Sequence, residues 1–249
     1  MNTANLAAAR SELAPMGRLR VGINYGNFLL VTKDPAGGPP RGIVVDLAHE
    51  LGKRLGVAVE FVGYDWAGTL ADAAKSGAWD IGFLGAEPQR SGEIAFTAAY
   101  LEIPATYLVR AESPLRAIED VDREGVRIAV AGKSAYDLYL TRTIERARLV
   151  RAEGIEGSYE LFVRDGLEAL SGLKPRLVMD AARLPGARVL EGRFTAIQQA
   201  IGTPRGRDAG AAYLREFAEE AKASGLVAAA IDRHGVRGVS VAPPAPAAT

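Results

Sequence analysis

Short apolar runs alternate along this chain with longer runs of helical periodicity. The short runs are residues 18–23, 57–62, 80–84, 105–109 and 126–131, and the helical runs include residues 46–55, 69–75, 208–224 and 226–233. Parallel strands need a crossover connection, usually a helix, so this alternation predicts an α/β fold with parallel sheets covered by helices. The pattern starts again after residues 113–114, so we expect two lobes.

The composition narrows the classes of function. The chain of 249 residues has 30 basic and 30 acidic residues and a formal net charge of +0, so it lacks the sustained positive field that nucleic acid or an anionic membrane surface would need. It has no cysteine and 2 histidines, so we expect no metal and no cofactor. A stretch of about 18 apolar residues, which a membrane span would need, is absent.

The two ends of the chain indicate less about location and structure than the central part does. Residues 1–10 (MNTANLAAAR) lack the basic leader and apolar stretch of a secretion signal. The expected location is therefore periplasmic if a signal peptide was removed, and cytoplasmic otherwise. We assign residues 1–17 to an N-terminal extension and residues 241–249, which are rich in proline and alanine, to a disordered tail.

A candidate anion site follows the run at residues 80–84 (DIGFL). The next residues are Gly85, Ala86, Glu87, Pro88, Gln89 and Arg90. Proline suits the first turn of a helix, and the N–H groups of that turn have no partner within the helix. Because these donors would lie beside the Arg90 guanidinium, the segment is suited to holding a carboxylate.

Further candidate residues follow other predicted strands. Residues 24–28 (NYGNF) form the loop beyond the first strand, where ligands bind in open α/β sheets. Ser134 and Asp137 form an S-x-x-D capping box, which predicts a second helix with exposed donors at its start. Residues 161–170 are read as a helix, and residues 176–179 as a buried strand that ends at Asp180.

Four stretches resemble the extracellular solute-binding proteins of family 3, the polar amino-acid binding proteins of ABC importers. Residues 42–51 resemble a signature G-[apolar]-[D/E]-[apolar]-D-L, in which Asp46 begins a helix with a stripe of leucines. The other stretches are residues 80–100, which resemble a strand ending in T-P-x-R and then an apolar-F-[ST]-x-x-Y motif, residues 174–180 and residues 201–206.

The resemblance implies a two-lobed type II periplasmic-binding-protein fold, in which each lobe is a mixed, mostly parallel sheet flanked by helices. Lobe 1 would comprise residues 18–103 and 204–240, and lobe 2 residues 104–203. The lobes would be joined by crossing segments near residues 101–106 and 196–203 and would close by a hinge motion on a solute in the cleft between them.

The resemblance also implies roles for individual residues. Arg90 would bind a ligand carboxylate and Asp180 an ammonium, with Trp66 as a wall and Ser134 as a donor from the second lobe. The chain departs from the family where Glu87 replaces a threonine, and where Asn24 stands at a place that is often acidic. The full set of expected ligand-binding residues is Asn24, Tyr25, Asn27, Phe28, Trp66, Phe83, Gly85, Ala86, Arg90, Lys133, Ser134 and Asp180.

The expected function is capture of a small carboxylate-bearing solute, an amino acid or a related acid, for an ABC importer. The expected partners are that solute and the transporter permease, with no nucleic acid, no membrane insertion and a monomeric state. Two alternatives stay open. One is an enzyme on the same scaffold, a dehydratase or lyase resembling cyclohexadienyl dehydratase, with Glu87 as the catalytic acid, and the other is a cytoplasmic ligand sensor.

Overall fold

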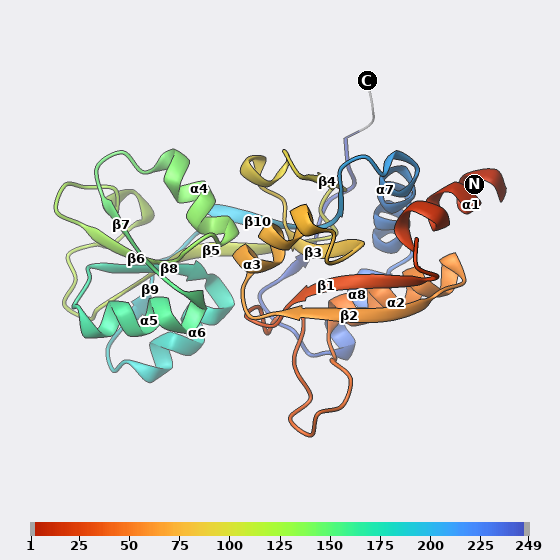
Figure 1. The fold of residues 1–249 in the computed structure, drawn as a ribbon. Helices are drawn as coiled ribbons and strands as arrows, with labels where there is room; N and C mark the ends of the chain where they lie inside the picture. Colours follow the sequence, from red (N-terminus) through yellow and green to blue (C-terminus); the bar gives the residue numbers. More distant parts are fainter. Residues whose placement is uncertain (1–2, 247–249) are drawn as a thin grey trace. The chain divides into compact units, whose positions relative to one another are not determined.

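The computed structural model describes residues 3–246 and divides the chain into two compact units (Figure 1). Unit 1 comprises Met1–Glu102 and Gln198–Thr249, and unit 2 comprises Ile103–Ile197. Two strands, β5 (Leu101–Val109) and β10 (Thr195–Pro204), begin in one unit and end in the other. The predicted mixed α/β architecture with two lobes is confirmed.

The sheet of unit 1 is parallel except at one side. Strands β1 (Arg18–Asn24), β2 (Ala58–Tyr64) and β3 (Ile81–Gly85) are parallel, in the order β2-β1-β3, and β10 runs antiparallel to β3. Two short strands complete it: β4 (Ile94–Phe96) pairs with β10, and β11 (Ser240–Val241) pairs with the start of β5. The carboxyl ends of the parallel strands therefore share one edge of the sheet.

The helices of unit 1 pack in pairs. The pairs are α2 (Ile43–Leu55) with α8 (Leu226–Arg233), and α7 (Asp208–Ala223) with α1 (Thr3–Leu13); α3 (Ala67–Asp72) and the 3-10 turn η1 (Ala73–Ser76) precede β3. Trp79 is fully buried and donates its indole N–H to the Leu70 carbonyl at 2.9 Å. Gly22 makes room for this packing, because a Cβ there would lie 2.5 Å from Leu70 Cδ1.

The helix containing Asp46 begins earlier than the sequence predicts. Gly42 is its N-cap and Asp46 lies in its first turn, where the carboxylate pairs with Arg233 and His234 of α8. The prediction that Asp46 caps the helix is wrong, because Gly42, with φ 141°, adopts the cap position through a backbone conformation that favours glycine. The predicted leucine stripe at Leu47, Leu51 and Leu55 is buried.

A network around Asp80 fixes the amino end of β3. Its fully buried carboxylate accepts hydrogen bonds from the backbone N–H (3.0 Å), Nε (3.0 Å) and Nη2 (2.8 Å) of Arg20 and from Nη1 of Arg207 (3.0 Å). The Asp80 backbone carbonyl accepts from the Thr203 hydroxyl at 2.9 Å. Because Arg20 lies on β1, Thr203 on β10 and Arg207 just before α7, the side chain and backbone of this one residue connect three segments of unit 1.

Helix α1 occupies most of the predicted N-terminal extension. Leu13 is fully buried, and a Cβ at Gly210 of α7 would lie 2.7 Å from Leu13 Cδ2. Glu12 Oε2 accepts the Gly210 N–H at 2.8 Å, so α1 supplies an acceptor to the first turn of α7. In the predicted tail, Val241 pairs with Leu101, and residues 247–249 lie outside the described part of the chain.

The sheet of unit 2 has the order β5-β8-β6-β7. Strands β6 (Arg127–Ala131), β7 (Arg148–Ala152) and β8 (Ala169–Leu173) are parallel, whereas β5 is antiparallel to β8 and to the short β9 (Arg188–Val189). Three helices, α4 (Ala135–Thr143), α5 (Gly154–Arg164) and α6 (Lys174–Arg183), follow β6, β7 and β8 respectively, and a 3-10 turn η3 (Ile118–Asp120) precedes β6.

Two sequence predictions in unit 2 are wrong. The helix expected over residues 161–170 is the end of α5, which stops at Arg164, followed by a turn at Gly166 (φ 58°) and the start of β8. The strand expected over residues 176–179 is part of α6. Pro175 lies in the first turn of that helix, and the side chains of Val178 and Met179 are exposed while Leu177 is buried, which is the spacing of a one-sided helix.

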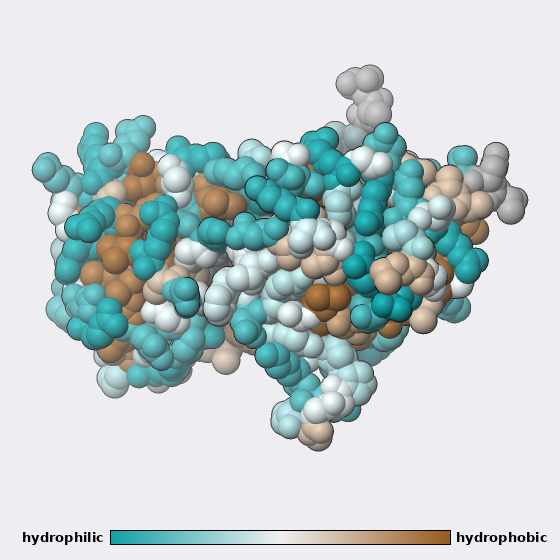
Figure 2. Space-filling view, viewed as in Figure 1, coloured by the Kyte–Doolittle hydropathy of each residue, from teal (hydrophilic) through white to brown (hydrophobic). Residues whose placement is uncertain are grey.

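The surface agrees with the balanced composition. Hydrophilic residues cover most of the face shown in Figure 2. Within the described residues, the large hydrophobic side chains that are exposed are Met16, Val163, Val178 and Met179, and no helix is long and apolar enough to cross a membrane.

Candidate ligand-binding site

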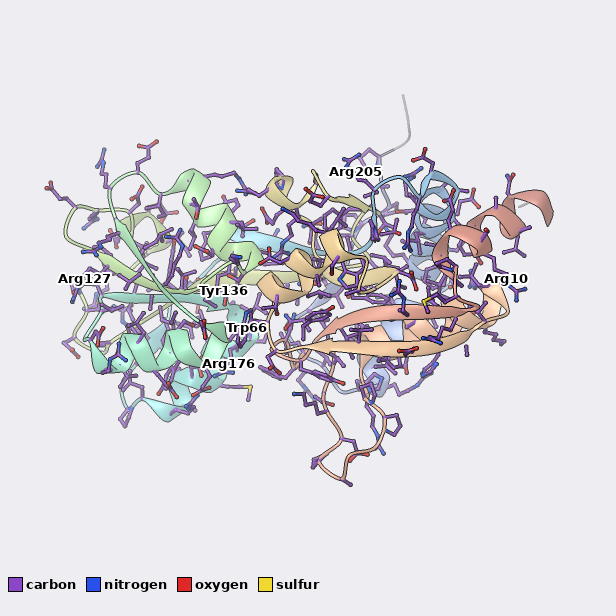
Figure 3. All side chains as sticks on the ribbon, viewed as in Figure 1. Arg10, Trp66, Arg127, Tyr136, Arg176 and Arg205 are labelled. Atoms are coloured by element: carbon purple, nitrogen blue, oxygen red, sulfur yellow. The ribbon has the colours of Figure 1, made fainter. Side chains whose placement is uncertain are left out.

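Each unit has an edge at which its parallel strands end, and most of the predicted site residues, though not Phe83 or Asp180, follow these edges. In unit 1, the carboxyl ends of β1, β2 and β3 lead into residues 25–28, Trp66 and residues 86–90. Figure 3 shows Trp66 at the end of unit 1 remote from Arg10. Trp66 is half-buried and is the residue before α3.

Arg90 is buried at the edge of unit 1. It ends a 3-10 turn, η2 (Pro88–Arg90), so the predicted proline start is confirmed but the element is a single turn. The residue is 6% exposed, and its Nη1 donates to the Gly85 carbonyl at 2.7 Å. Burial lowers the pKa of Arg90 to about 10, although the nearby carboxylates of Glu87 and Asp72 oppose the shift. Arg90 therefore stays charged at neutral pH.

The residues before Arg90 are largely committed to the fold. The Gly85 carbonyl accepts from Arg90, and the Ala86 N–H donates to the Gln198 carbonyl at 2.8 Å. The Phe83 ring is buried and meets the Tyr100 ring edge-on, with 5.7 Å between centroids. The expectation that backbone N–H groups near Gly85 stand ready for a ligand is thus wrong for Ala86, because strand pairing with β10 extends through that residue.

The loop after β1 is held in one shape by its own hydrogen bonds. Asn24 Oδ1 accepts the Gly26 N–H at 3.0 Å, and the Asn27 carbonyl accepts from the N–H groups of Leu30 (3.0 Å) and Val31 (3.2 Å). Asn27 is 6% exposed, and its Oδ1 is buried without a hydrogen-bond partner in the described part of the chain. The sequence names Asn27 as a candidate but contains no signal for an unsatisfied acceptor.

A surface hollow of about 310 Å³ lies beside this loop. Its lining residues are Tyr25, Gly26, Phe28, Val31, Thr32, Lys33 and Asp65. Lys33 Nζ lies 4.7 Å from the centroid of the Tyr25 ring and 3.1 Å from Asp65 Oδ1. Sequence reasoning missed Lys33 and Asp65, because their pairing joins segments that are 32 residues apart.

In unit 2, one half of the predicted capping box after β6 is present, and in the other half the Asp137 side chain bonds Lys133 instead of Ser134. Ser134 Oγ accepts the Asp137 N–H at 3.1 Å, which confirms Ser134 as the N-cap of α4. The Asp137 carboxylate accepts the backbone N–H of Lys133 at 2.8 Å and also pairs with Arg151. Lys133 has φ 57°, a left-handed conformation that is uncommon for lysine.

Asp180 lies in a different environment from the expected one. It lies on α6, is 1% exposed, and accepts hydrogen bonds from Arg176 Nε (3.0 Å) and Arg183 Nη1 (3.1 Å). Both arginines also pair with Glu156 of α5. Burial raises the pKa of Asp180, although the two arginines oppose the shift. The prediction that Asp180 closes a strand is wrong, since the residue that closes β8 is Leu173.

Tyr136 joins this edge of unit 2. Figure 3 shows Tyr136 and Arg176 at the end of unit 2 remote from Arg127, which lies at the start of β6. The Tyr136 side chain is buried, which raises the pKa of its hydroxyl, while the nearby Ser134 hydroxyl and Arg176 charge oppose that shift. Sequence reasoning missed Tyr136 and Arg176. Within residues 3–246, no group of three or more acidic or histidine side chains is arranged to hold a metal ion.

Two α/β units joined by two continuous strands, with polar residues at the carboxyl ends of their strands, are the arrangement that the resemblance to solute-binding proteins implies. The model of the bacterial extracellular solute-binding proteins, family 3, matches residues 19–236, and the chain belongs to this family. The match confirms the resemblance read from the sequence, and with it a solute-binding role.

Solved structures of similar fold agree with this assignment. A mutant of ArgBP from T. maritima has a TM-score of 0.74 at 21% identity, covering 90% of this chain and 98% of that one. The cysteine-binding protein from Campylobacter jejuni has a TM-score of 0.74 at 17% identity, covering 91% and 92%. An ancestral amino acid-binding protein, a precursor of cyclohexadienyl dehydratase, has a TM-score of 0.73 at 22% identity, covering 90% and 98%.

Proposed function

We propose that this protein binds a small carboxylate-bearing solute and that Arg90 supplies the cation that recognises it. The observation that carries the proposal is a buried guanidinium at the carboxyl end of β3. A guanidinium presents a planar fork of donors that matches a carboxylate, and its attraction is stronger where water is excluded.

The other candidate residues complete this proposal. At the same edge of unit 1, the Asn24–Phe28 loop and the half-buried Trp66 ring would add further contacts. Within unit 2, Ser134 and Lys133 at the start of α4 stay predictions from the sequence. Asp180 is left out of the proposed site, because both carboxylate oxygens accept from Arg176 and one also accepts from Arg183. Phe83 is left out because its ring lies in the core.

The test is ligand-dependent thermal stabilisation of the native protein and of Arg90→Ala. A screen of amino acids, dicarboxylates and aromatic carboxylates should give at least one concentration-dependent rise in Tm. Amino acids belong in the screen because the similar structures include an amino acid-binding protein and a cysteine-binding protein. Arg90→Ala should lose about 2–5 kcal/mol of binding free energy, as expected when a desolvated charge pair is broken.

A matched control separates binding from folding. Arg215 is exposed on α7, and Arg215→Ala should leave both the Tm and the affinity unchanged. Equal affinity of the native protein and Arg90→Ala, with both variants folded by circular dichroism, would remove Arg90 from the site. A native protein that responds to no carboxylate would contradict the proposed ligand class.

The family associates such proteins with ABC transporters and with an extracellular or periplasmic location. We extend the proposal to a monomer that delivers its solute to an importer in the periplasm. Light scattering with and without the ligand tests the monomeric state, and co-purification with the permease tests the delivery step.

A second candidate, an enzyme on this scaffold, is favoured by one observation. Glu87 is 8% exposed and lies next to the Arg90 charge, so a bound carboxylate would lie near a buried acid. If a stabilising ligand is consumed over hours and Glu87→Gln stops the consumption while keeping the Tm rise, the protein is an enzyme with Glu87 as its acid. A ligand recovered intact supports the binding protein.

A further inference from the structure

Unit 1 has a second hollow, which lies between three of its helices and which we call the helix groove. Helices α1 and α7 lie side by side in this unit (Figure 1). Arg54 of the groove is in the last turn of α2, just before β2 begins, so the groove is near the amino ends of the strands and apart from the candidate carboxylate site. The groove has a volume of about 250 Å³ and is lined by Leu6 of α1, Arg54 of α2, and Tyr213, Glu216, Phe217 and Glu220 of α7.

The helix groove already holds one cation, which belongs to the chain itself. The Arg54 guanidinium lies 5.0 Å from the centroid of the Phe217 ring, and it pairs with Glu50 at 2.8 Å and with Glu220 at 2.7 Å. The hydrogen bonds to Glu50 and Glu220 raise the pKa of Arg54, although burial opposes the shift. An aromatic ring with carboxylates beside it therefore stabilises a positive charge at this place.

Groups of the same two kinds, a carboxylate and an aromatic side chain, remain available beside Arg54. Glu216 is exposed and has no ion pair among the described residues, and it lies one turn before Glu220 on α7, where like charges repel each other. Tyr213, one turn earlier, is 6% exposed, and its hydroxyl makes no hydrogen bond within residues 3–246. A buried hydroxyl without a partner costs free energy, so both groups would gain from a positively charged donor.

We propose that the helix groove binds a small organic cation, an amine or a guanidine with an apolar body. The cation donates to the Glu216 carboxylate and the Tyr213 hydroxyl, and the apolar body packs against Leu6 and the Tyr213 ring. The groove is smaller than the roughly 300–1,000 Å³ of pockets that enclose drug-sized ligands, so the ligand is small. The α1 wall lies outside residues 19–236, which the family model matches, so the family assigns no role to this groove.

The charges around the helix groove disfavour an anion. Glu50, Glu216 and Glu220 supply three carboxylates, whereas the lining contains one guanidinium, that of Arg54. The nearby Arg10 lies at the carboxyl end of α2, whose partial negative charge attracts it. A ligand cation is therefore attracted by a carboxylate that no cation of the described chain neutralises.

Benzylamine and benzyl alcohol test the proposal, because they share one ring, differ in charge and carry no carboxylate. Each is titrated into the native protein and followed by NMR. Benzylamine should saturate and shift resonances of α1 and α7, and benzyl alcohol should bind at least about fivefold more weakly. Added salt should weaken binding of the amine, because the carboxylate is exposed. Equal affinity for the two probes, or no binding of the amine, would overturn the proposal.

Variants of α7 separate binding from folding. Glu216→Gln should weaken benzylamine binding about fivefold without lowering the Tm, because it also removes the repulsion from Glu220. Tyr213→Phe keeps the ring and should weaken benzylamine binding more than benzyl alcohol binding. The control Glu112→Gln changes an exposed acid of unit 2 and should leave the affinity unchanged. Unchanged affinity in Glu216→Gln, or an equal loss in the control, would contradict the proposal. Arg90→Ala should bind benzylamine like the native protein, so the helix groove and the carboxylate site can fail separately.

Discussion

Two buried aspartates, one in each unit, have the same kind of partners and opposite pKa shifts. Asp80 of unit 1 and Asp180 of unit 2 are each at most 1% exposed and each bound by two arginines. For Asp80, burial acts to raise the pKa, but hydrogen bonds from Arg20 and Arg207 outweigh it and the net shift is downward. For Asp180, burial outweighs the same kinds of partners and the shift is upward.

The difference lies in how the arginines are shared. Arg20 offers Asp80 a backbone N–H and two side-chain donors. Arg176 and Arg183 divide their donors between Asp180 and the more exposed Glu156, and hydrogen bonding from Arg183 lowers the pKa of Glu156 to about 2. Counting arginines around a buried acid is therefore not enough, because the acid that receives undivided donors is the one whose charge is stabilised.

The largest effect expected from this comparison is that of Asp80→Asn. The substitution leaves Arg20 and Arg207, whose side chains are 18% and 19% exposed, without their anion, and should lower the free energy of unfolding by about 3–5 kcal/mol. Urea unfolding at pH 7 measures it. A loss below about 1 kcal/mol would show that the Asp80 network contributes little to stability.

Asp180→Asn should lower the free energy of unfolding by a smaller amount, about 1 kcal/mol. Glu156 remains to pair with both arginines, and the Arg183 side chain is already 46% exposed. The matched control is Asp165→Asn, which breaks only an exposed pair with Arg164. It should lower the free energy of unfolding by still less. If Asp180→Asn cost as much as Asp80→Asn under the same urea conditions, the sharing of donors would not matter.

The smallest effect is a difference in pH dependence. Since the folded pKa of Asp80 lies below its unfolded value of about 3.9, its stabilisation is present above that value and is lost as the pH falls through the folded pKa. The folded pKa of Asp180 is raised, so its contribution is greatest below about 3.9 and is lost as the pH rises through the folded pKa.

Unfolding of the native protein and of both variants between pH 3 and pH 7 measures these signs. The loss of unfolding free energy caused by Asp80→Asn should become smaller toward low pH. The unfolding free energy of Asp180→Asn, relative to that of the native protein, should be highest near pH 7. Parallel curves for the two variants would mean that the two carboxylates titrate alike in the folded state.

Local patterns made the fold of unit 1 and the start of unit 2 predictable. The β1 run, the leucine stripe of α2 and the Ser134 cap each depend on residues close in sequence, and they form as expected. The region of β8 and α6 failed because short apolar runs fit a strand or a helix equally well. There the buried strand was read as helix and the helix as strand, which moved the expected end of the strand from Leu173 to Asp180.

The candidate site was predictable to the level of residue type but not of partner. A proline and an arginine after a buried strand indicate a turn and a charge, and Arg90 lies on that turn. Its bond to the Gly85 carbonyl and the unsatisfied Oδ1 of Asn27 depend on backbone angles within short loops. Sequence spacing does not fix such angles, because several turn types fit the same residues.

The contact between α1 and α7 bears on where this chain can be shortened. A version that begins at Gly17 would remove Leu13 from its packing against Gly210 and would take away the Glu12 carboxylate that the Gly210 N–H donates to. The exposed flank of a 16-residue helix would then face solvent. Removal of these first residues to shorten the chain for expression is therefore expected to give a protein that is less soluble and more prone to aggregate.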